Sequence, residues 1–135
     1  MLTFLKKFPL SIIWVLFILV MCSVRMTSIP FSGSVHIPNF DKVVHFGFFF
    51  VLSALLFMES TKQQNTSLTR FKVSGTIFLI AAIYGGSIEL LQKFVFTYRS
   101  AEWLDFLADA AGSMCSILLI LIFTTAKKAE TENVH

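Results

Sequence analysis

The sequence predicts an all-α integral membrane protein that crosses the bilayer four times. Hydrophobic residues make up 56% of the 135-residue chain and charged residues only 14%, and a soluble domain of this length could not bury so much apolar surface. Four apolar runs, each close to the length of a spanning helix, are separated by polar connections. We expect a single domain over residues 1–135, with its core motifs at about residues 39–123.

The first predicted span covers about residues 8–24 and follows Lys6 and Lys7. A basic start before a short apolar run is also typical of a signal peptide, but residues 21–25 lack the pair of small residues that a cleavage site needs. We therefore expect this run to stay in the protein as a helix that mainly shields the others. Its Cys22 is expected to be a packing residue.

The other predicted spans cover about residues 40–58, 73–91 and 104–123. The second span is short, so its first turn is expected to begin in the polar residues before it, with an asparagine or aspartate as the cap. Residues 59–70 are polar and are expected to end this span and lead to the next one. The third and fourth runs have nearly the ~20 residues that a spanning helix needs.

The distribution of Lys and Arg predicts that both termini lie in the cytoplasm. Seven basic residues lie in the amino-terminal stub, the loop after the second span and the tail, whereas four lie in the other two connections. Basic residues next to a span favour the cytoplasmic side and contact anionic lipid headgroups. We therefore interpret the net charge of +3 as an indication of contacts with membrane lipids, and not with nucleic acid.

Unusual polar residues gather at the outer ends of the last three predicted spans. They are Asp41, Lys42 and His45 before and in the second span, Glu89 and Gln92 at the end of the third, Tyr98, Arg99 and Glu102 in the connection, and Asp105 and Asp109 in the fourth. Residues three or four apart share a helix face, so each helix presents a polar stripe. A charged residue facing lipid costs ~2.5–3.5 kcal/mol at a span centre, so we expect the stripes to face one another.

Glu89 is the member of this set whose position most needs an explanation. The aspartates lie in or near first turns, where the helix dipole favours a carboxylate, but Glu89 lies near a carboxyl end, where the dipole opposes one. We expect it to pair with Arg99, Lys93 or His45, or to carry a proton. Helix caps and snorkelling side chains are a structural explanation for part of the set. Buried ionisable groups in membranes usually mark a function.

These residues resemble the motifs of the VanZ-like family of small bacterial membrane proteins. The matching strings are residues 41–46 (DKVVHF), residues 88–92 (IELLQ), Arg99 and residues 105–112 (DFLADAAG), in the order and with the approximate spacing of the family. The resemblance implies a multi-pass protein of the bacterial cytoplasmic (inner) membrane. It also implies a link to antibiotic resistance, since some members lower sensitivity to teicoplanin and other amphiphilic antibiotics.

Asp109 departs from the family pattern, which usually has an asparagine there. A second carboxylate four residues after Asp105 adds negative charge, which calls for a proton or for a cation such as Arg99. Ser116 stands where a glycine often follows Gly112. Its small side chain still allows close approach of two helices.

The first functional hypothesis is an outward-facing pocket that binds a lipid headgroup, a cell-wall precursor or an amphiphilic antibiotic, in envelope homeostasis or glycopeptide tolerance. Arg99 and Lys42 would hold a phosphate or carboxylate, and Tyr98 would lie at headgroup level. The predicted binding residues are Asp41, Lys42, Gln92, Tyr98, Asp105 and Asp109.

Two other functions stay open. In a membrane enzyme acting on a lipid-linked or phosphorylated substrate, His45, tuned by Asp41 one turn away, would be the general acid or base, Glu89 its partner carboxylate and Arg99 the group that stabilises developing charge. In a small proton-coupled transporter, Glu89 and His45 would relay protons, and four short spans would favour a homo-oligomer over a monomer.

No cofactor and no metal ion are predicted. The carboxylates and His45 could supply ligands from three helices, as a variant of the enzyme hypothesis. Their spacing matches neither the His-Glu-x-x-His zinc motif nor the Glu-x-x-His motif of di-metal bundles.

Overall fold

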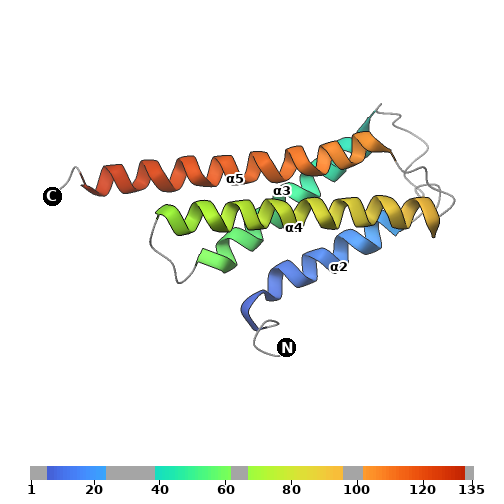
Figure 1. The fold of residues 1–135 in the computed structure, drawn as a ribbon, viewed down its shortest axis with the longest axis horizontal. Coiled ribbons are helices and arrows are strands. Elements are labelled where there is room, and N and C mark those ends of the chain that lie inside the picture. Colours follow the sequence, from blue (N-terminus) through green and yellow to red (C-terminus); the bar gives the residue numbers. More distant parts are fainter. Residues whose placement is uncertain (1–5, 24–38, 62–66, 96–101, 133–135) are drawn as a thin grey trace.

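The computed structural model describes residues 6–23, 39–61, 67–95 and 102–132. These ranges contain the helices α2 (Pro9–Ser23), α3 (Phe40–Thr61), α4 (Ser67–Phe94) and α5 (Trp103–Glu132), and no strand. Successive helices run in opposite directions; α4 and α5 lie side by side, and α3 crosses behind them (Figure 1). The predicted all-α membrane bundle of four helices is confirmed.

Three stretches of the described helices are long and apolar enough to cross a membrane: Phe40–Thr61, Thr69–Phe94 and Trp103–Ala126. They contain the second, third and fourth predicted spans. The first predicted span corresponds to the shorter apolar helix α2, which has 15 residues. Large apolar side chains remain exposed on the outside of the bundle, as expected for a surface in contact with lipid.

The helices extend further into the polar segments than the sequence suggests. The prediction that residues 59–70 form a connection is wrong at both ends, because α3 continues to Thr61 and α4 begins at Ser67. Glu59 is the reason at the first end. It lies on the buried face of α3, only 4% exposed, because it has a structural partner in α2.

The carboxylate of Glu59 binds the amino end of α2. Its Oε1 accepts a hydrogen bond from Leu10 N (3.0 Å), and its Oε2 accepts hydrogen bonds from Ser11 N (3.2 Å) and Ser11 Oγ (2.6 Å). The first N–H groups of a helix have no partner within it, and the positive end of its dipole favours a carboxylate. Pro9 fits the first helical position, because it has no N–H group to satisfy. This contact fixes α2 against α3.

A close approach of α5 to α3 determines the geometry of the site described below. A Cβ atom on Gly112 would collide with the carbonyl oxygen of Phe46 and lie 2.9 Å from its carbonyl carbon, so any side chain would push the two backbones apart. Deeper in the bundle, Ser53 Oγ donates a hydrogen bond to Ser113 Oγ (2.7 Å). Small residues allow such contacts in membranes, where helix association depends on packing and interhelical hydrogen bonds.

We expect Gly112→Ala to lower the free energy of unfolding by about 1–3 kcal/mol, because the added methyl group overpacks the contact with Phe46. Thermal unfolding of the purified protein in detergent would measure the loss. Gly75→Ala is the matched control, since a Cβ there meets nothing within 4 Å, and replacing glycine in a helix favours folding. Equal melting temperatures for the two variants would contradict the proposed close contact.

Candidate functional site

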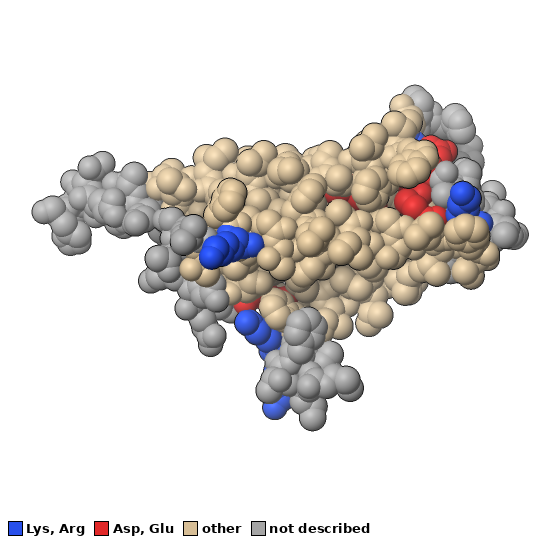
Figure 2. All heavy atoms as spheres, in the orientation of Figure 1, with Lys and Arg blue, Asp and Glu red and all other residues tan. Residues whose placement is uncertain are grey.

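Polar residues of three helices meet at one end of the bundle. There α3 begins, α4 ends and α5 begins, and Figure 2 shows acidic side chains gathered at this end. The predicted site residues that the structure describes here are Asp41, Lys42, His45, Glu89, Gln92, Asp105 and Asp109. Arg99 and Tyr98 lie outside the described residues.

At the centre of the cluster, His45 of α3 pairs with Asp109 of α5. The imidazole Nδ1 lies 3.0 Å from Asp109 Oδ1, and the side chains are only 1% and 0% exposed. Gly85 of α4 makes room for this pair, because a Cβ atom there would lie 2.7 Å from Asp109 Oδ2. Spacing along α3 predicted Asp41, one helical turn away, as the residue that tunes His45. Asp41 does lie near the ring, and the helix crossing in addition brings Asp109 to Nδ1.

Lys42 ties the amino ends of α3 and α5 together. Its Nζ lies 2.8 Å from Glu102 Oε2 and 3.3 Å from Asp105 Oδ1. The Asp105 side chain is 2% exposed, whereas that of Glu102 is 47% exposed. Lys42 is therefore already engaged by carboxylates of the protein itself. This makes it less available for the anionic ligand group expected from the sequence.

Glu89 reaches the amino end of a second helix. Its Oε2 accepts a hydrogen bond from Glu102 N (3.0 Å), directly before α5 begins at Trp103. The dipole of α4 disfavours a carboxylate at this position, but the dipole of α5 favours it. This compensation could not be predicted from the sequence of α4 alone, because it depends on how α5 packs against α4.

The helix α2 also contributes to the cluster, beyond the shielding expected from the sequence. Gln92 Nε2 donates a hydrogen bond to the carbonyl oxygen of Cys22 (3.3 Å), and the Cys22 side chain lies beside the His45 imidazole. Cys22 and Cys115 do not form a disulfide. No motif in the sequence indicates that Cys22 would approach the site, because this contact depends on how α2 docks.

Several buried polar atoms of the cluster have no hydrogen-bond partner among the described residues. They are His45 Nε2, Glu89 Oε1, Gln92 Oε1 and Asp109 Oδ2. Buried polar atoms are nearly always paired, and an unpaired one costs free energy. Unpaired atoms gathered in one place are typical of a site that receives water or a ligand.

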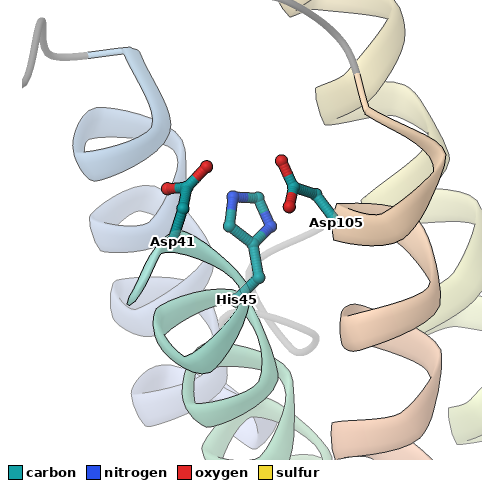
Figure 3. Close-up of side chains that lie close together, drawn as sticks. All are labelled: Asp41, His45 and Asp105. Atoms are coloured by element: carbon teal, nitrogen blue, oxygen red, sulfur yellow. The ribbon is translucent and has the colours of Figure 1, made fainter. Parts of the chain in front are cut away.

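The His45–Asp109 pair can support several kinds of chemistry. A carboxylate on Nδ1 fixes the orientation of an imidazole and leaves Nε2 to exchange a proton, to accept a hydrogen bond or to bind a metal ion. His45 belongs to two groups of three residues that could hold a metal ion. One group is Asp41, His45 and Asp105, and the other is His45, Glu89 and Asp109; within each group the three ligand atoms lie within 4.8 Å of one another. Figure 3 shows the imidazole between the carboxylates of Asp41 and Asp105.

We expect His45→Ala and Asp109→Ala each to lower the free energy of unfolding by about 3–5 kcal/mol, because each leaves a buried polar group unpaired. The double variant should lose much less than the sum of the two single losses. Reversible unfolding in mixed detergent micelles would measure the free energy of unfolding of the wild type, the two single variants and the double variant. The exposed Lys42–Glu102 pair is the control, and its two substitutions should be nearly additive. Additive losses at His45 and Asp109 would show that the pair does not act as a unit.

Comparison with known proteins gives the family of this chain. A similar protein is an uncharacterized protein of Schizosaccharomyces pombe, which is 27% identical over 112 residues. The match covers 81% of this chain and spans 64% of the length of that relative. No solved structure matches. The family model described as VanZ/LLP1 matches residues 3–124, which include the apolar helix α2, the first two long spans, all but the last two residues of the third span, and the polar cluster. The chain is therefore a membrane protein that belongs to the VanZ/LLP1 family.

Proposed function

We propose that the polar cluster binds the headgroup of an amphiphile: a membrane lipid, a lipid-linked cell-wall precursor or an amphiphilic antibiotic. The protein would then act in envelope homeostasis or glycopeptide tolerance, in keeping with the association of its family with antibiotic resistance. The observation that carries this proposal is the His45–Asp109 pair, 1% and 0% exposed within a bundle of apolar helices. Ionisable groups are costly at such a place, and they usually mark a ligand or proton site.

The unpaired atoms of the cluster indicate the chemistry of the headgroup. Glu89 Oε1, Gln92 Oε1 and Asp109 Oδ2 are all acceptors, so they favour a group that donates hydrogen bonds, such as a hydroxyl, an amine or an amide. Lys42 already pairs with two carboxylates. A phosphate in the same ligand would therefore depend mainly on Arg99.

Apolar side chains next to the cluster are suited to the tail of the same ligand. Leu90 and Phe94 of α4 and Leu104 and Leu107 of α5 are each more than half exposed. Trp103, at the start of α5, is 84% exposed, and tryptophan is enriched at the level of lipid headgroups. A ligand with a polar head and an acyl tail would thus meet matching surfaces.

Acid–base catalysis on such a ligand is the second candidate function. It is favoured by one observation, the orientation of His45 by Asp109 with Nε2 left without a hydrogen-bond partner in the described part of the chain. In this arrangement Nε2 could take a proton from an attacking hydroxyl or water, and Glu89 would act as the second carboxylate. Binding and catalysis use the same residues, so products have to be followed to distinguish them.

His45→Ala and Glu89→Gln should each abolish saturable binding of a labelled lipid-linked cell-wall precursor to the purified protein, because both remove groups that face the headgroup. Lys93→Gln is the matched control, since it changes a charged residue of α4 outside the cluster. Binding would be measured in detergent micelles, and the lipid would then be analysed for products. Arg99→Ala tests the expected phosphate contact.

Turnover that disappears in His45→Ala would favour the enzyme, whereas binding without products would favour the binding protein. If His45→Ala and Glu89→Gln both reach the membrane at normal levels and bind as wild type does, the cluster is not the ligand site. A teicoplanin growth assay with the same variants would test the link to antibiotic tolerance.

We also propose that the cluster faces outward and that both termini lie in the cytoplasm of a bacterial cell. Reporter fusions after Gln64, in the connection of α3 to α4, and after Lys128 should both report the cytoplasm. This expectation follows from the excess of basic residues at that end of the bundle. An external signal from either fusion would reverse the orientation and place the cluster on the cytoplasmic side.

A further inference from the structure

We infer that Asp41, His45 and Asp105 form a binding site for a divalent transition-metal cation of the Zn²⁺ or Mn²⁺ type. The inference goes beyond the proposed function, because it needs no lipid and concerns the outer part of the cluster. One ligand atom from each of the three residues lies within 4.8 Å of the other two. The residues come from the first two turns of α3 and the first turn of α5, and Figure 3 shows the imidazole between the two carboxylates.

The pairing of His45 leaves one nitrogen for this site. Nδ1 lies 3.0 Å from Asp109 Oδ1, whereas Nε2 is buried and has no hydrogen-bond partner among the described residues. In Figure 3 one ring nitrogen lies on the side of Asp41 and the other on the side of α5, which carries Asp109. A histidine that binds a metal usually donates its other N–H to a carboxylate. Asp109 meets this requirement.

The carboxylates of the trio can reach a common ion without breaking the contacts of Lys42. Lys42 Nζ contacts Asp105 through Oδ1, so an ion held through Asp105 Oδ2 would leave this contact in place. Asp41 and His45 are four residues apart on α3 and therefore share a face of the helix. Metal bonds of about 2.0–2.2 Å would bring the three ligand atoms to roughly 3.3 Å from one another. Small side-chain rotations would suffice for this contraction.

The electrostatic environment also favours a cation. Asp41, Glu89, Asp105 and Asp109 surround His45, and Asp105 and Asp109 are 2% and 0% exposed. Negative charge removed from water is costly unless a cation or a proton compensates it, and the Lys42 ammonium that faces Asp105 is shared with Glu102. A divalent ion bound by two carboxylates would neutralise both of them. One imidazole with two carboxylates suits Zn²⁺ or Mn²⁺, whereas Ca²⁺ and Mg²⁺ prefer oxygen ligands alone.

The test uses the full chain, purified in detergent, treated with a chelator and then equilibrated with ZnCl₂ or MnCl₂ in the absence of added lipid. Elemental analysis of the desalted protein should find about one ion per chain. His45→Ala and the isosteric variant Asp105→Asn should each weaken binding by at least about tenfold. Glu102→Gln, which removes a nearby carboxylate outside the trio, should bind as wild type does.

A measurement on the wild-type protein keeps the inference testable if a variant does not fold. Mn²⁺ bound at this site should show magnetic coupling to an imidazole nitrogen in pulsed electron paramagnetic resonance, and metal should raise the melting temperature. Absence of metal from the wild-type protein, absence of nitrogen coupling, or unchanged binding in both trio variants would overturn the metal site. None of these results would decide whether the deeper atoms of Glu89 and Gln92 bind a headgroup.

Discussion

The contact between Gly112 and the backbone of Phe46 is the constraint on which the site depends. His45 directly precedes Phe46, and Asp109 lies one helical turn before Gly112 on α5, so the approach of the two backbones brings the imidazole to the carboxylate. Gly85 has a similar role on α4, where it leaves space for the Asp109 side chain. Three helices can therefore pack around one buried polar pair. The glycines contribute to the site by allowing the helices to approach closely, and not by contacting a ligand.

This arrangement combines apolar packing with buried polar contacts at both ends of the bundle. At one end, the carboxylate of Glu59 is fully used as a cap for α2. At the other end, the carboxylates of Glu89 and Asp109 each retain an oxygen with no hydrogen-bond partner among the residues that the structure describes. Burial alone therefore does not distinguish a structural carboxylate from a candidate ligand site. The difference lies in whether every acceptor atom has a donor.

Much of the fold could be predicted from the sequence because the bilayer imposes strong rules on length and hydrophobicity. The gathering of the polar stripes also followed from helical spacing and alternating direction. The partner of His45 and the compensation of Glu89 could not be obtained in this way, because both depend on how different helices cross. Glu59 was assigned to a loop for a related reason: its donors lie in α2, almost fifty residues away in the sequence.

The way α2 is held at both ends has a consequence for the membrane around the protein. Its 15 residues span about 22 Å, whereas the hydrocarbon layer of a typical bilayer is about 30 Å thick. Glu59 fixes one end of α2, and the hydrogen bond from Gln92 to the Cys22 carbonyl fixes the other. The polar contacts at the two ends of α2 are therefore too close together for each to lie at a surface of such a bilayer. Either lipid thins around α2, or one of these contacts lies below the headgroups, so hydrophobic mismatch would favour thinner membranes.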